Sequence, residues 1–210
     1  MPLFQCHKSE LYEWGIWKTD ESESELLSVF PIEDRNRYII QSQTFKSESR
    51  RLEWLAVRAL LFQLLGETKV IAYQENGKPY LADRSANISI SHTKGYVAVI
   101  VSKDREVGID IEQYGERVRR ITHKFVREDE CINGREGMST QSLLLIWSAK
   151  EVMFKCIDTQ EIDFREHLYV RLPSDNIPSM YAREFRSFSQ LEFNIDYFLH
   201  SDFVMTWTVI

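Results

Sequence analysis

The strongest constraint on the fold comes from two apolar patterns that predict long helices. Between Ser49 and Leu65, apolar residues follow the three-and-four spacing of one helix face: Leu52, Leu55, Ala59, Phe62 and Leu65. Gly66 comes next, and glycine commonly ends a helix. The segment from Gln141 to Ile157 predicts a second helix, with one inward stripe: Leu144, Trp147, Glu151 and Phe154. The fold must therefore bury one face of each helix.

Short segments rich in β-branched and aromatic residues surround these helices and predict strands at residues 11–18, 88–90, 96–102, 105–112, 169–172, 192–198 and 203–209. Further helical segments are expected at residues 21–30, 31–40 and 118–130. Asn76-Gly77 predicts a turn. Because helices alternate with strands that are able to pair antiparallel, the pattern favours an α+β fold.

Composition excludes several classes of protein. The 210 residues are 43% hydrophobic, which suits a buried core, and no apolar stretch is long enough to cross a membrane. The first ten residues lack a signal-peptide core, so a cytoplasmic location is expected. Cys6, Cys131 and Cys156 form no CxxC pair, which favours reduced thiols. A net charge of −6 does not suit a general nucleic-acid binder.

Three carboxylates form the candidate site. Asp110 and Glu112 stand two residues apart in an apolar run, so on a strand they share one face. They repel each other unless a cation lies between them, and Mg²⁺ takes oxygen ligands of this kind. Glu151 is able to supply a third oxygen from a helix. Taken alone, Asp-x-Glu is typical of a solvated strand end, and Glu151 with Lys155 is typical of an i,i+4 helix pair.

Four motifs in a fixed order favour a functional interpretation: residues 76–81 (NGKPYL), 87–93 (NISISHT), 108–112 (GIDIE) and 147–155 (WSAKEVMFK). Between Arg35 and Lys155 this set resembles the 4'-phosphopantetheinyl transferase superfamily, specifically its longer, monomeric, surfactin-synthetase-activating type. The resemblance implies two similar α/β lobes related by pseudo-twofold symmetry. We place them at residues 1–102 and 103–210.

The resemblance implies a reaction that moves the 4'-phosphopantetheine arm of coenzyme A to a serine of an apo acyl or peptidyl carrier protein and releases 3',5'-ADP. Asp110, Glu112 and Glu151 match the family's Mg²⁺ ligands. Lys155 matches a lysine that binds phosphate or orients the serine. Glu130 matches a glutamate suggested as general base, although its neighbours Glu128 and Asp129 leave the register open.

The resemblance also implies a coenzyme A site. His92 matches the family histidine that contacts phosphate, and Ser91 is able to donate to the same phosphate. Gly77 and Lys78 form a turn where backbone approaches adenine and the lysine ammonium approaches phosphate. The candidates for the far phosphate are Arg35, Arg51 and Arg58, with Arg50 as an alternative to Arg51. Val57 precedes Arg58 where relatives commonly have glycine.

Basic residues gather in residues 115–127 (GERVRRITHKFVR). By composition this is a solvated helix face; by resemblance it faces an acidic carrier protein. Two alternatives to the transferase stay open. One is a catalytically silent module of the same fold that binds coenzyme A or a carrier protein, and the other is a Mg²⁺-dependent phosphohydrolase that uses the same acids on water.

Overall fold

The computed structural model describes residues 3–130, 137–157, 161–173 and 179–210. The chain divides into two compact units, Met1–Glu106 and Val107–Ile210. The predicted boundary lies four residues earlier, after Ser102, which is the last residue of a strand. The division falls instead in the connection that leads to the next strand.

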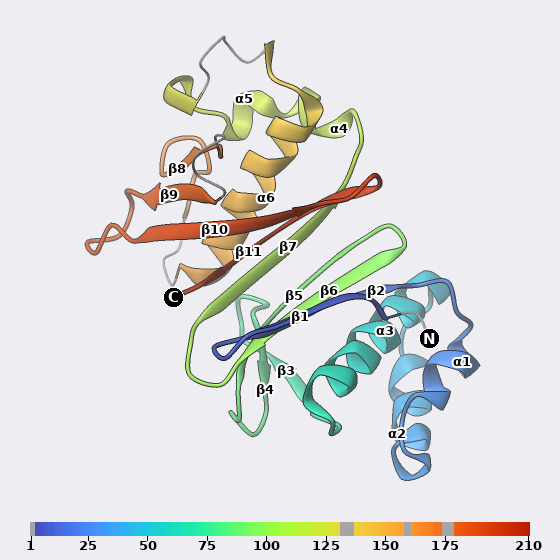
Figure 1. The fold of residues 1–210 in the computed structure, drawn as a ribbon. Helices are drawn as coiled ribbons and strands as arrows, with labels where there is room; N and C mark the ends of the chain where they lie inside the picture. The colour runs from blue at the N-terminus through green and yellow to red at the C-terminus, as the bar shows by residue number, and fades with distance from the viewer. Residues whose placement is uncertain (1–2, 131–136, 158–160, 174–178) are drawn as a thin grey trace. The chain divides into compact units, whose positions relative to one another are not determined.

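The first unit contains a four-stranded antiparallel sheet covered by a long helix (Figure 1). Its strand order is β1-β2-β6-β5: β1 (Leu3–Lys8), β2 (Glu13–Lys18), β6 (Tyr96–Ser102) and β5 (Asn87–Thr93). Helix α3 (Glu48–Leu65) packs on β2 and β6, and a Cβ at Gly15 would stand 2.7 Å from a Leu60 methyl. The helices α1 (Glu23–Ser28) and α2 (Ile32–Ser42) pack on α3, and a separate hairpin joins β3 (Ile71–Tyr73) to β4 (Pro79–Leu81).

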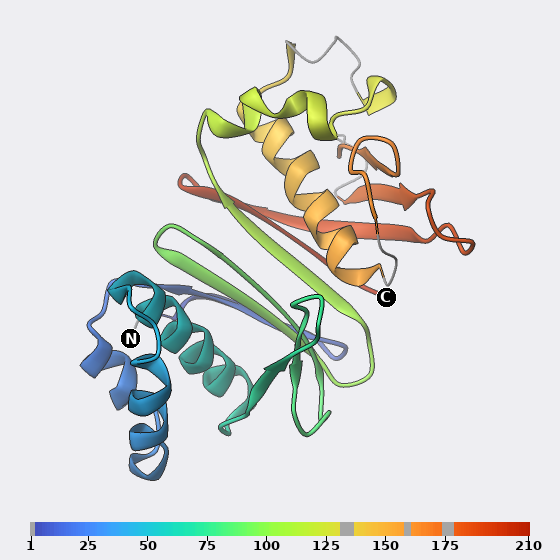
Figure 2. The ribbon, with the colours of Figure 1, turned by 180° about the vertical axis from the view of Figure 1, so that it is seen from behind.

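The second unit contains a five-stranded antiparallel sheet and one long helix (Figure 2). Its strand order is β7-β11-β10-β9-β8: β7 (Val107–Gln113), β11 (Phe203–Val209), β10 (Glu192–Leu199), β9 (Met180–Glu184) and β8 (Leu168–Arg171). Helix α6 (Thr140–Cys156) packs on β7 and β11. Gly108 permits this close approach, because a Cβ there would stand 2.9 Å from the carbonyl oxygen of Val152. Between β7 and α6 lie α4 (Arg117–Arg120), α5 (Thr122–Phe125) and the 3₁₀ turn η1 (Glu128–Glu130).

The two units repeat one chain path. In each unit a strand, β2 or β7, comes before a long helix, α3 or α6. Each then ends with a hairpin, β5–β6 or β10–β11, whose last strand pairs antiparallel with that first strand. Each unit therefore combines an antiparallel sheet with a long helix, as in an α+β fold.

The two long helices and the predicted strands are confirmed, whereas some other predictions are wrong. Both long helices begin and end within one residue of the predicted bounds, and Gly66 caps α3 with a φ of 72°. The helix predicted at residues 118–130 is instead α4, α5 and η1, since β-branched residues disfavour a continuous helix and Val126 is extended. Phe154 was predicted to face inward, but it is 45% exposed. The strands β1, β3, β4 and β9 were not predicted.

Two of the cysteines lie among the described residues, and both are free thiols. Cys6 is exposed and Cys156 is buried, whereas Cys131 lies outside the described residues. Within the described ranges, the longest apolar helices fall short of what a membrane crossing requires.

Candidate functional site

Strand β7 places Asp110 and Glu112 on one side of the second unit's sheet. The isoleucines at positions 109 and 111 point to the other side and are at most 1% exposed, as the alternation predicts. Asp110 is itself 5% exposed, while Glu112 is partly exposed. Pairing with β11 fixes this register, because Thr206 lies opposite Asp110.

Helix α6 presents a polar face to these acids. Trp147, Glu151 and Lys155 recur every four residues and therefore share one face of the helix. The Trp147 indole Nε1 donates to Glu112 Oε1 at 2.7 Å. Lys155 Nζ donates to Asp110 Oδ1 at 2.9 Å and to the Ile109 carbonyl at 2.7 Å. Strand and helix thus hold one cluster, Asp110, Glu112, Glu151 and Lys155, which we call the acid cluster.

The acid cluster has too little positive charge for its carboxylates. The pKa of Glu151 is raised to about 7, first by burial and then by repulsion from Asp110, while Lys155 opposes the rise. The pKa of Glu112 is also raised, by burial and then by Asp110, while its bond from Trp147 opposes the rise. A bound cation would relieve both penalties.

The donor chemistry of the acid cluster fits a hard divalent cation. Mg²⁺ prefers carboxylate oxygens and completes its shell with water and phosphate. In the described ranges, no three acid, histidine or cysteine side chains are gathered closely enough to hold a metal ion as they stand. The Lys155 ammonium occupies one oxygen of Asp110, so ion binding would require these side chains to rearrange. Asp110, Glu112 and Glu151 are the residues that would hold the ion.

Glu130 lies in a buried ion pair and not in the acid cluster. The side chains of Glu130 and Lys150 are both 0% exposed, with 2.8 Å between Nζ and Oε1. Glu130 also accepts from the amides of Arg127 and Val170, each at 2.7 Å. A general base must reach the proton that it takes, and this carboxylate is enclosed by its own partners. The structure therefore gives no support to Glu130 as the base.

Lys150 ties three segments together. Its ammonium donates to the carbonyls of Phe125 at 2.6 Å and Phe164 at 3.0 Å, besides its bond to Glu130. Burial lowers the pKa of Lys150 to about 8, although Glu130 opposes the fall. The alternatives for the base differ from Glu130: Glu128 is exposed, and Asp129 pairs with Arg127 at 2.8 Å.

Four of the five cations in residues 115–127 are exposed: Arg117, Arg119, Arg120 and Lys124. Arg127 differs, since it pairs with Asp129 and donates to the carbonyl of Glu166 at 2.8 Å. The exposed cations lie on α4 and α5, and we call them the basic surface.

Some of the predicted coenzyme A residues line one cavity of about 180 Å³ in the first unit. Arg58 reaches it from α3, Gly77 from the predicted turn, and His92 from β5. Arg50 also lines the cavity, and its Nη1 lies 3.1 Å from His92 Nε2. Of the two candidates Arg50 and Arg51, Arg50 is therefore the one at this cavity. We call it the His92 cavity.

The other four predicted coenzyme A residues are not among those that line the His92 cavity. Arg35 donates to the carbonyl of Ser28, the last residue of α1, and to that of Phe30 just beyond it. Arg51 pairs with Glu23, and Lys78 pairs with Glu106. Ser91 is buried on β5.

Two aromatic residues of the His92 cavity were missed by the sequence analysis. Trp54 and Tyr73 both line it, and Trp54 stacks under the Arg58 guanidinium at 3.4 Å from the ring centroid. The four-residue spacing of Trp54 and Arg58 on a predicted helix was the available signal.

Comparison with known proteins identifies the second unit. Residues 106–208 match the family described as the 4'-phosphopantetheinyl transferase superfamily. This segment contains β7 and α6, and therefore the complete acid cluster.

Named relatives agree with this match. The chain is 30% identical over 127 residues to 4'-phosphopantetheinyl transferase gsp of Aneurinibacillus migulanus, covering 58% of this chain and 52% of that protein. It is 39% identical over 112 residues to 4'-phosphopantetheinyl transferase AcpT of Salmonella typhimurium, covering 50% and 58%. The chain thus spans about half the length of these two curated relatives. Through residues 106–208, the chain is therefore similar to the 4'-phosphopantetheinyl transferase superfamily.

Proposed function

We propose that this protein transfers the 4'-phosphopantetheine arm of coenzyme A to a serine of an apo acyl or peptidyl carrier protein. The acid cluster is the observation that carries the proposal. It lies within the segment that matches the superfamily, and burial and mutual repulsion raise the pKa values of two of its carboxylates. A cluster of this kind is suited to a cation shared with a diphosphate.

The proposed reaction is a phosphoryl transfer. The serine oxygen forms a bond to the phosphorus that carries pantetheine, the bond from that phosphorus to the bridging oxygen breaks, and 3',5'-ADP leaves with that oxygen. The serine proton passes to a general base. Mg²⁺, held by Asp110, Glu112 and Glu151, would neutralise charge that develops on the diphosphate.

Lys155 is the cation of this chain that lies in the acid cluster. Its ammonium is partly exposed and rests on Asp110. When a diphosphate binds, the same ammonium is able to move to a phosphate oxygen or to the attacking serine. Trp147 positions Glu112 through its indole N–H.

The His92 cavity is our candidate for part of the coenzyme A site. Arg50 and Arg58 supply positive charge there, and the exposed His92 accepts from Arg50 through Nε2. Gly77, with a φ of 86°, adopts a left-handed conformation that favours glycine and keeps the adjoining loop free of a side chain. Lys78 would have to leave Glu106 to reach a phosphate.

The basic surface is our candidate for carrier docking. Carrier proteins are expected to be acidic around the modified serine, and exposed arginines suit such a partner. Arg117 and Arg120 would contribute most directly, because Arg119 is already 3.6 Å from Glu116 and donates to Thr140.

Pseudo-twofold symmetry, a monomeric state and a cytoplasmic location remain predictions.

Mass spectrometry of apo carrier proteins after incubation with coenzyme A and Mg²⁺ tests the proposal. We expect the carrier serine to gain the phosphopantetheine mass and 3',5'-ADP to appear. Asp110→Asn and Glu151→Ala should abolish the gain, whereas Glu166→Ala, at an exposed acid of the same unit, should not. Binding of coenzyme A without any gain over a broad carrier panel would favour the silent module, and release of phosphate into water would favour the phosphohydrolase.

A further inference from the structure

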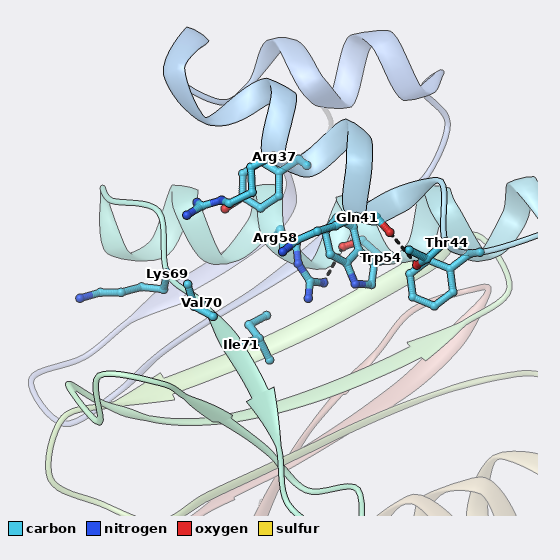
Figure 3. Close-up of a pocket in the computed structure, with 10 residues that line it drawn as sticks. Arg37, Gln41, Thr44, Trp54, Arg58, Lys69, Val70 and Ile71 are labelled. Atoms are coloured by element: carbon cyan, nitrogen blue, oxygen red, sulfur yellow. Dashed lines mark hydrogen bonds between the residues drawn. The ribbon is translucent and has the colours of Figure 1, made fainter.

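The first unit contains a second cavity, of about 200 Å³, on the side of α3 that faces α2 and β3 (Figure 3). Ten residues line it, and they come from α2 and the turn after it, from α3, and from β3 with the two residues before it. Trp54 and Arg58 also line the His92 cavity, so their stacked side chains border both spaces. We call this space the α2–α3 cavity.

Arg58 is a buried cation with neutral partners. The residue is 7% exposed, and its Nη1 donates to the Trp54 carbonyl at 3.0 Å. Burial lowers the pKa of Arg58 to about 10, and the groups that oppose this fall are the hydroxyls of Tyr73 and Tyr38. Among the described residues, no carboxylate pairs with Arg58. A buried guanidinium without a carboxylate favours an anion at its remaining donors.

The rest of the lining has the same character. No carboxylate is among the ten described residues that line the cavity. Arg37 and Lys69 line the cavity too, but each is paired with an acid outside the lining. Arg37 lies 2.9 Å from Asp34, and Lys69 lies 2.7 Å from Asp83. In Figure 3 the Lys69 side chain points away from the other lining residues, so Arg58 is the inward cation.

Aromatic rings form the apolar walls. Tyr38, Phe45 and Trp54 line the cavity, with ring centroids of Tyr38 and Trp54 at 5.9 Å and those of Phe45 and Trp54 at 6.1 Å. Ile71 closes the side toward β3. An engineered apolar cavity of about 150 Å³ is enough for benzene. The α2–α3 cavity therefore has space for one ring and a small charged group.

We propose that the α2–α3 cavity binds a small aromatic carboxylate, with its carboxylate at Arg58 and its ring against Trp54 and Phe45. The arrangement combines the features of a ligand pocket, namely apolar walls and one charged group that orients the ligand. The proposal concerns a different cavity from the proposed coenzyme A site and does not depend on transferase activity.

Ligand-observed NMR titration of the full chain with benzoate, beside benzamide of the same shape, tests this proposal. We expect saturable binding of benzoate and binding of benzamide that is weaker by about tenfold or more, because a charge-assisted bond to Arg58 is lost. Equal affinity for the two probes, or no saturation with benzoate, would overturn the proposal.

Variants locate the binding. Gln41→Trp fills the α2–α3 cavity from an exposed helix position and should remove benzoate binding while Arg58 stays in place. Arg58→Gln should equalise benzoate and benzamide. His92→Ala changes the other cavity alone and should leave benzoate affinity unchanged within about twofold. Loss of binding in His92→Ala, or retained binding in Gln41→Trp, would each refute a site in the α2–α3 cavity.

Discussion

Glu151→Gln should make the protein more stable and, at the same time, inactive. In the wild type the Glu151 carboxylate is desolvated and repelled by Asp110 and Glu112, and its pKa is about 7 in place of the ordinary 4.5. Glutamine keeps the shape of the side chain and removes the charge. The substitution therefore separates the stability that the Glu151 charge costs the fold from the contribution of that charge to activity.

The magnitude follows from the pKa. Each unit of difference between the folded and unfolded pKa is worth about 1.4 kcal/mol, so ionisation of Glu151 costs the folded state at most about 3.5 kcal/mol. The side chain is partly exposed, and solvent screens part of this penalty. We expect Glu151→Gln to raise the free energy of unfolding by about 1–2 kcal/mol above pH 7.

The sign depends on pH in a defined way. Below the unfolded pKa, both states hold the proton and the penalty is absent. Between pH 4.5 and about 7, folded wild type keeps a proton that the unfolded chain has released, so its stability falls as pH rises through this window. The advantage of Glu151→Gln should therefore be near zero at about pH 4 and fully developed at about pH 8.

Hydrogen exchange of α6, followed by mass spectrometry without divalent ions, reports the stability of this helix in the context of its own unit. Glu128→Gln, at an exposed glutamate of the same unit, is the matched control and should show no gain. Mg²⁺ should protect α6 in the wild type and not in Glu151→Gln, because the variant lacks a ligand. Equal or lower stability of Glu151→Gln at about pH 8 would refute the account of the acid cluster.

Three further predictions concern the same unit. Lys150→Met should destabilise this unit by about 3–5 kcal/mol, because Glu130 would remain charged and buried without its partner. Urea unfolding measures the loss, and the exposed control Lys124→Met should lose about 0.5 kcal/mol or less. An equally small loss for Lys150→Met would contradict the prediction. Gly108→Ala should cost about 1–3 kcal/mol, because its Cβ would stand 2.9 Å from a carbonyl oxygen of α6; an unchanged melting temperature would show that the helix yields. Arg120→Glu should raise KM for the carrier protein and leave kcat unchanged, more strongly at low salt than at high salt; an unchanged KM in steady-state kinetics would remove α4 from the docking surface.

The sequence predicts those elements whose burial leaves a periodic pattern. Helices α3 and α6 have the expected length because apolar residues recur along them, although both are buried on more than one face; β11 (Phe203–Val209) has the bounds that the sequence predicted. Strand β1 lacks such a pattern, because it lies at the edge of its sheet and most of its side chains are exposed. What holds β1 in place is pairing with β2, and backbone pairing leaves little trace in residue type.

Some features of the candidate site were also predictable from the sequence, and others were not. The shared face of Asp110 and Glu112 follows from the two-residue period of a strand, so it was predictable. The role of a long side chain was not, because its reach allows several partners within the same motif. Arg51 ends on Glu23 and on the carbonyl of Phe45, while its neighbour Arg50 faces the cavity. Only the packing of α1 against α3 distinguishes the two arginines.

Helix α6 links the stability of the second unit to its proposed chemistry. Lys150 and Glu151 are consecutive, so they point about 100° apart on the helix. One enters a buried ion pair that ties α6 to η1, and the other enters the acid cluster on the side of β7. The ion pair therefore holds the helix from one side while carboxylate repulsion opposes packing on the other. A variant that weakens the pair should displace Glu151, destabilise α6 and lower transfer activity together, whereas loss of a catalytic base should lower activity and leave the stability of α6 unchanged.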